Sequence, residues 1–225
     1  MRWYLSTRTK LGLALLGASL VSVGFWAVGA LSNGNTELWY LVWNLGLAWI
    51  PLLLALWLES VLRMRLWSSW LALLVTFLWL AFLPNSFYVI SDFVHLTEIP
   101  RVDVVFDVVM FGSFAINGLI LGYLSLFMVH HELRKRLSAR TTGLIVTAVL
   151  LLSSFAIYIG RDLRWNTWDV IFSPASLLFD VSDRLLNPGA HPQVFSTTAA
   201  FFVLLSSIYV VVFYIVRVTR HQKVL

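Results

Sequence analysis

The amino-acid sequence predicts an all-α, polytopic membrane helix bundle of about six transmembrane helices, with both termini in the cytoplasm. Hydrophobic residues make up 60% of the 225 positions and charged residues only 12%, about half of the roughly 25% that a soluble domain carries. The mean hydropathy is +0.84. The remaining charges gather between long apolar runs. These observations describe one transmembrane domain, residues 1–225, whose surface faces lipid.

The apolar runs set the number and the place of the helices. A helix needs about 20 apolar residues to cross roughly 30 Å of hydrocarbon, because each residue rises about 1.5 Å. Helix is also the one conformation that satisfies its backbone hydrogen bonds within a single segment in lipid. We expect helices at about residues 11–31, 38–58, 66–91, 107–130, 141–160 and 193–217.

The first run resembles a signal peptide in two respects. It follows Arg2, Arg8 and Lys10, and Val28-Gly29-Ala30 resembles a small-residue cleavage site. Its apolar stretch is nevertheless longer than the roughly 7–15 residues of a signal peptide. We therefore expect a retained first helix.

Lysine and arginine predict the orientation. Six spans place 12 of the 16 basic residues on one side, at the two termini and in two loops: Arg2, Arg8, Lys10, Arg63, Arg65, Arg134, Lys135, Arg136, Arg140, Arg217, Arg220 and Lys223. Cytoplasmic segments of membrane proteins carry such an excess. We expect a multi-pass protein with this side in the cytoplasm. His130 and His131 lie beside the basic loop, where we expect them to be solvated or to contact anionic lipid head groups.

Several classes of function find no support in the sequence. The net charge of +5 does not indicate nucleic acid, because the basic residues lie at the ends of the spans. The absence of cysteine excludes disulfides and thiolate metal sites. His95 and His191 are the histidines expected outside, too few for a zinc site of about three ligands. We expect no metal site, and the alternative of a hard cation held by Asp92, Asp103, Asp107 or Asp169 stays open. The sequence identifies no cofactor.

Two asparagines and one long loop interrupt the apolar pattern. An asparagine amide in hydrocarbon is costly unless it bonds to another helix, so Asn44 and Asn117 are expected to point into the bundle. Between the last two spans, the outer segment 161–192 contains an apolar stretch, Trp168 to Leu186, that Pro174 and charges interrupt. We expect a short helix there, lying at the membrane interface.

A polar constellation falls at the outer ends of the third, fourth and fifth helices. Tyr88, Asp92 and His95 are spaced i, i+4 and i+7, so they share one face of an α-helix. Asp92 and His95 are the candidate catalytic residues. The candidate substrate-binding residues have polar side chains at the same predicted depth: Asn85, Tyr88, Arg161, Arg164, Asn166 and Asp169. We expect Asp92, His95, Arg161, Arg164, Asn166 and Asp169 to converge in one pocket. The alternative is a structural ion pair between Asp92 and an arginine.

Three motifs resemble those of a known family. The runs Trp43-Asn44-Leu45, Pro84-Asn85 followed by Asp92 and His95, and Arg161 to Asp169 are similar to those of an uncharacterised bacterial membrane protein family, domain of unknown function 1361. The family's motifs fall on Asn44, Pro84, Asn85, Asp92, His95, Arg161, Arg164, Asn166 and Asp169. The resemblance implies a protein of the bacterial inner membrane and supplies no activity.

Two hypotheses for the function stay open. In the first, the polar set at the outer face binds or processes a lipid-linked or anionic substrate. In the second, the chain is a non-enzymatic partner subunit, transporter component or assembly factor of a membrane complex. Membrane lipids are the expected partners in both, together with a partner membrane subunit or a second copy of the chain. The sequence does not decide whether the protein is an enzyme.

Overall fold

The computed structural model describes residues 6–34, 36–97, 104–165, 167–187 and 189–221 of the chain. Over these residues the secondary structure is helical and contains no strand, which confirms the all-α class. The cytoplasmic location of the two termini stays a prediction. The chain divides into two compact units, Met1–Val129 and His130–Leu225, and each is described by itself.

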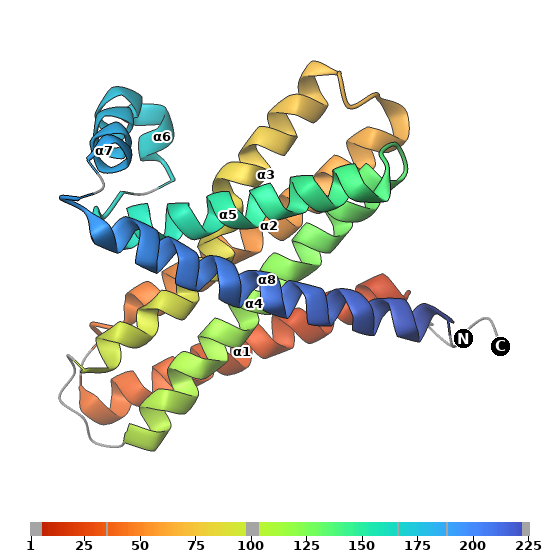
Figure 1. The fold of residues 1–225 in the computed structure, drawn as a ribbon. Helices are drawn as coiled ribbons and strands as arrows, with labels where there is room; N and C mark the ends of the chain where they lie inside the picture. The colour runs from red at the N-terminus through yellow and green to blue at the C-terminus, as the bar shows by residue number, and fades with distance from the viewer. Residues whose placement is uncertain (1–5, 35, 98–103, 166, 188, 222–225) are drawn as a thin grey trace, which may run out of the picture. The chain divides into compact units, whose positions relative to one another are not determined.

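The N-terminal unit consists of long helices (Figure 1). They are α1 (Thr7–Asn33), α2 (Trp39–Met64), α3 (Trp70–Tyr88), a 3₁₀-helix η1 (Val89–Thr97) and most of α4 (Val104–Arg134). Its most extensive helix–helix contact joins α2 to α3. A core of buried apolar side chains, among them Leu45, Leu52 and Phe114, is contributed by α1, α2, η1 and α4.

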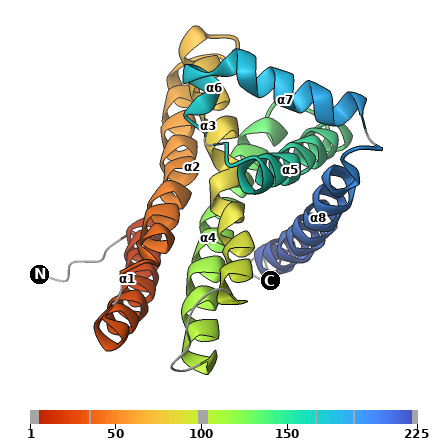
Figure 2. The ribbon, with the colours of Figure 1, turned by 90° about the vertical axis from the view of Figure 1, so that its left-hand side faces the viewer.

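The C-terminal unit begins with the last turn of α4 and contains α5 (Ala139–Asp162), α6 (Asp169–Phe172), α7 (Pro174–Leu186) and α8 (Pro192–His221). Helices α5 and α8 pack against each other, and α6 and α7 stand between them in the chain (Figure 2). A small core of Tyr158, Ile159 and Val194 receives Leu177 and Val181 from α7.

Six of the helical segments in the described residues are long and apolar enough to cross a membrane. They are Thr7–Ser32, Trp39–Met64, Trp70–Leu96, Val104–Arg134, Ala139–Asp162 and Pro192–Val218. Each contains most of one predicted span, so the multi-pass prediction is confirmed.

The third predicted span differs from the structure in its conformation. It begins later than predicted, at Trp70, because the Ser69 hydroxyl caps the helix by accepting from the Ala72 N–H at 3.4 Å. The α-helix ends at Tyr88 and the chain continues as a 3₁₀-helix to Thr97. A 3₁₀-helix has three residues per turn, so Asp92 and His95 share a face with Val89. The expectation that Tyr88 belongs to this face was therefore wrong.

The stretch from Trp168 to Leu186 forms two helices, α6 and α7, and Pro174 is the first residue of the second. Helix therefore forms where it was expected, in two pieces instead of one, and its position at the membrane interface stays a prediction. Helix α7 has no buried residue and exposes Leu178, Phe179, Leu185 and Leu186, an apolar face of the kind that enters the interfacial region of a membrane.

Close packing between α3 and α4 depends on two glycines. A Cβ atom at Gly118 would lie 2.5 Å from the carbonyl oxygen of Ser86, and one at Gly122 would lie 2.7 Å from a ring carbon of Phe87. Both distances are far below van der Waals contact. Only a residue without a side chain lets the two backbones approach this closely.

Candidate functional site

A buried carboxylate joins two helices of the N-terminal unit. Asp92, on η1, is 2% exposed. The side-chain amide of Asn44, on α2, donates a hydrogen bond of 3.0 Å to its Oδ2 atom. This bond confirms that Asn44 points into the bundle. It also gives the buried carboxyl group of Asp92 a polar partner, and burying such a group without a hydrogen bond is costly.

His95 lies one 3₁₀ turn after Asp92 and repeats the contact with α2. Its ring meets the ring of Tyr40 edge-on, with centroids 5.5 Å apart and an interplanar angle of 67°. Four residues of α-helix and three residues of 3₁₀-helix both rise by about 6 Å. The spacing of Tyr40 and Asn44 therefore matches that of His95 and Asp92, and this match sets both contacts in one row.

A third contact continues this row of contacts along α2 and onto α3. One α-helical turn beyond Asn44 on α2, the carbonyl oxygen of Ala48 accepts a hydrogen bond of 2.9 Å from the Ser86 hydroxyl on α3. Ser86 is fully buried. We call the contacts Tyr40–His95, Asn44–Asp92 and Ala48–Ser86 the polar row of the N-terminal unit.

Asn117, on α4, provides a second interhelical contact. Its amide nitrogen lies 2.7 Å from the Ser22 hydroxyl and 3.2 Å from the Ala18 carbonyl oxygen, both on α1. It also lies 3.0 Å from the Ser113 carbonyl oxygen in its own helix. Asn117 is 6% exposed, so the expectation that it points into the bundle is confirmed.

Two of the remaining candidates also lie in the N-terminal unit. The Asn85 amide donates to the Phe82 carbonyl oxygen, 3.1 Å away in its own helix, and Tyr88 is half-buried at the end of α3. Asp107 is buried in the first turn of α4. Asp103, which the sequence places near it, lies outside the described residues.

The arginine motif belongs to the C-terminal unit. Arg161 is half-buried in the last turn of α5, Arg164 is exposed just after the helix, and Asp169 begins α6. Asn166 lies outside the described residues. Arg164 has φ 57°, the one positive value among the described residues other than glycine. Such a backbone costs energy and persists where surrounding contacts fix it.

The Asp92 set and the arginine set thus lie in different units. Their convergence in one pocket stays a prediction.

Three hydrogen bonds join α7 to residues that precede and follow it in the C-terminal unit. The Trp165 indole donates to Asp180 Oδ2 over 2.9 Å. Asp183 accepts from the Asn187 amide at 2.7 Å and lies 3.1 Å from His191 Nε2. The Asn187 amide, and then His191, hold the pKa of the Asp183 carboxyl below its ordinary value. Sequence reasoning did not predict these hydrogen bonds. The only sign of them in the sequence is that Asp180, Asp183 and His191 are polar residues in or next to an apolar stretch.

Among the residues that the structure describes, no group of three or more histidine, aspartate or glutamate side chains is arranged to hold a metal ion.

Six candidate spans, with a polar row between helices that is buried at Asp92 and Ser86, define a polytopic helical membrane protein. More particularly, the chain belongs to the family described as protein of unknown function (DUF1361), whose model matches residues 43–213. The match includes Asn44, Asp92, His95, Arg161 and Arg164, so the resemblance seen in the motifs is confirmed. No curated protein and no solved structure matches the chain.

Proposed function

We propose that the protein binds an anionic, lipid-linked substrate at the outer face of the bacterial inner membrane. The observation that carries the proposal is the burial of Asp92, 2% exposed within a candidate membrane span and bonded to Asn44. An ionisable residue inside a membrane is expensive, and proteins retain such residues chiefly for function.

The chemistry of the polar row suits a site that handles a charged group. Asp92 is an acceptor that orients a cationic partner, and the His95 imidazole has two ring nitrogens that donate or accept hydrogen bonds. Asn85 and Tyr88, near the end of α3, supply further hydrogen-bonding groups. These residues are proposed as the half of the site that orients the substrate and moves a proton.

The two arginines are the proposed grip on the anion. A guanidinium presents a planar fork of N–H donors that binds a phosphate or carboxylate through two parallel hydrogen bonds. Arg161 and Arg164 end the fifth span at the predicted outer side, and Asp169 follows closely. The proposal expects Asp92 to orient one of the arginines.

Helix α7 is the proposed point of entry for the lipid. Its exposed face of Leu178, Phe179, Leu185 and Leu186 is proposed to lie in the outer leaflet, where amphipathic helices bury their apolar side. A substrate on a lipid carrier would then reach the site without leaving the membrane.

The test compares a charged lipid with its neutral counterpart. Full-length protein in phosphatidylcholine nanodiscs is titrated with a polyprenyl phosphate and with the corresponding polyprenol. We expect the phosphate to bind more tightly. Arg164→Lys should weaken that binding by about tenfold, because an ammonium ion cannot reproduce the fork. Arg140→Lys, an exposed residue in the predicted cytoplasmic loop, is the matched control and should bind normally.

Equal binding of the two lipids, or no effect of Arg164→Lys in a protein that keeps its thermal stability, contradicts the proposal. A purely structural ion pair gives a different result. Asp92→Ala and Arg164→Ala would then each lower stability, and a double apolar replacement would restore it. These stability effects, together with a lack of binding to polyprenyl phosphate, would favour the alternative that the chain is a non-enzymatic partner subunit.

A further inference from the structure

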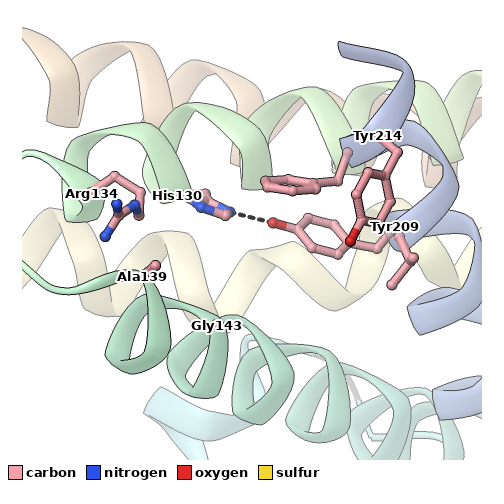
Figure 3. A pocket seen from close by; sticks show the side chains of 8 residues that line it. His130, Arg134, Ala139, Gly143, Tyr209 and Tyr214 are labelled. Atoms are coloured by element: carbon pink, nitrogen blue, oxygen red, sulfur yellow. Dashed lines mark hydrogen bonds between the residues drawn. The ribbon is translucent and has the colours of Figure 1, made fainter. Parts of the chain in front are cut away.

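The C-terminal unit contains a second candidate site at the end of α4, beside the basic loop. A cavity of about 280 Å³ is bounded by the end of α4, the start of α5 and the stretch of α8 from Tyr209 to Tyr214. Figure 3 shows Arg134 and His130 on α4 and Gly143 on α5, with Tyr209 and Tyr214 from α8. None of these residues takes part in the proposed outer site.

Aromatic contacts hold the histidine in place within this cavity. His130 is hydrogen-bonded through Nδ1 to the Tyr209 hydroxyl, and its ring stacks on Phe213 with centroids 5.6 Å apart and an interplanar angle of 17°. Tyr209 is itself 9% exposed. His130 is thus half-buried and held in place, so it is not the solvated residue that was one of the two expectations. The other expectation, a contact with anionic lipid head groups, stays a prediction.

Arg134 supplies the charge. Its Nη1 atom donates to the Leu137 carbonyl oxygen at 2.8 Å, which orients the side chain and leaves most of its five donors for another group. The neighbouring acid, Glu132, is paired with Lys135 at 2.5 Å and does not line the cavity. Arg134 therefore brings a positive charge to the cavity, and the described lining residues include no aspartate or glutamate to neutralise it.

The rest of the cavity is suited to hydrocarbon. A Cβ atom at Gly143 would meet nothing within 4 Å, so the α5 wall is open at this point. Phe213 and Val210 form the opposite wall, and Val210 and Tyr214 extend it outward on the exposed surface of α8. The volume lies just below the range of about 300–1,000 Å³ typical of ligand sites. It suits a head group whose chains lie along α8.

We propose that this cavity binds the phosphodiester head group of an anionic glycerophospholipid from the leaflet next to the basic loop. Three arguments select this occupant. The cation at the rim complements a phosphate, the aromatic and glycine walls complement a glycerol backbone and the start of an acyl chain, and the site lies at the end of three spans. Basic pockets between transmembrane helices on the cytoplasmic side bind anionic head groups in this manner.

The test uses full-length protein in mild detergent and counts bound lipids by native mass spectrometry. Phosphatidylglycerol is the probe and phosphatidylcholine is its neutral counterpart. We expect phosphatidylglycerol to be retained preferentially and Arg134→Gln to weaken it by about tenfold, the effect of losing roughly one charge-assisted contact. Arg136→Gln removes the same charge two residues away, outside the cavity, and should leave binding unchanged.

A second variant tests the cavity without altering any charge. Gly143→Leu places a side chain in the open space, and leucine favours helix over glycine, so the protein should fold and lose the lipid. Gly12→Leu on α1, where a Cβ atom also meets nothing within 4 Å, is the control and should retain it.

Equal losses for Arg134→Gln and Arg136→Gln overturn the proposal, because the lipid would then follow the charge of the whole loop. Normal binding by Gly143→Leu overturns it as well. Soluble glycerol phosphate that competes with the lipid at equal concentration would show a site for a water-soluble anion, which also contradicts the proposal. The variants differ from Arg164→Lys and the lipid differs from polyprenyl phosphate, so failure here is distinguishable from failure of the proposed function.

Discussion

The amide nitrogen of Asn44 lies 3.0 Å from Oδ2 of Asp92 and joins α2 to the 3₁₀-helix η1 within the N-terminal unit. The two residues are 48 positions apart in the chain. Both lie within the range that the family model matches, so this contact joins two segments of that range that are distant in sequence.

The first prediction concerns that contact. Asn44→Ala should lower the free energy of unfolding by about 1–2 kcal/mol, because it leaves a buried acceptor without one donor. Asp92→Ala should lower it too, and the double variant should be less destabilised than the sum of the two, as contacting residues are coupled. Unfolding in detergent, followed by tryptophan fluorescence, measures the cycle.

The control for this cycle is Thr76→Ala. The Thr76 hydroxyl donates to the Ala72 carbonyl oxygen in its own helix at 2.7 Å, so its loss should cost less than the loss of Asn44. Strict additivity of the Asn44 and Asp92 variants would show that the two side chains are not coupled.

The second prediction concerns close packing between helices. Gly118→Ala should destabilise the protein by about 1–3 kcal/mol, because the new methyl group would meet the Ser86 carbonyl oxygen at 2.5 Å and force the helices apart. Gly46→Ala is the matched control, since a Cβ atom there meets nothing within 4 Å. It should be neutral or stabilise the helix by up to about 1 kcal/mol. A melting temperature for Gly118→Ala equal to that of Gly46→Ala would refute the close approach.

The third prediction concerns pH. The folded-state pKa of Asp183 is lowered by the Asn187 amide and then by His191. The charged carboxylate therefore adds stability above the ordinary aspartate pKa of about 3.9, and that contribution is lost as the pH falls through the lower folded value. Wild-type protein should melt at a higher temperature than Asp183→Asn at pH 7, and the difference should shrink as the pH approaches 3.

Asp162→Asn is the control for the pH series. Asp162 is an exposed aspartate with no ion pair among the described contacts, so its replacement should not change the melting temperature at either pH. A difference between wild type and Asp183→Asn that grows on acidification would reverse the predicted sign.

The fourth prediction concerns topology. Twelve of the 16 basic residues lie on one predicted side, which places both termini in the cytoplasm. A C-terminal fusion to an enzyme that is active only outside the cytoplasm should be inactive, and the same enzyme fused after Asn187 should be active. The opposite pattern of activities would invert the orientation and move the arginine motif to the cytoplasmic side.

The six spans and the all-α class followed from the sequence because the conditions for crossing a membrane are met within each segment by itself. A run of apolar residues either matches the thickness of the hydrocarbon or does not, and the lipid gives its backbone no partner other than itself. The same reasoning predicted that Asn44 and Asn117 point inward and that helix forms between Trp168 and Leu186. Gly112, Gly118 and Gly122 could be singled out in the same way as small residues that permit close packing, and the structure shows a close approach at Gly118 and Gly122 but an ordinary contact at Gly112.

The partners of those residues were decided only by the tertiary structure. Periodicity shows that Asn44 faces a neighbouring helix but not which side chain meets it. Asp92 contacts Asn44 because the chain changes from α-helix to 3₁₀-helix after Tyr88. With that change, the rise over three residues of η1 equals the rise over four residues of α2. The aromatic packing around His130 likewise depends on Phe213, more than 80 residues away. Such contacts are non-local, so composition and spacing along one helix carry no record of them.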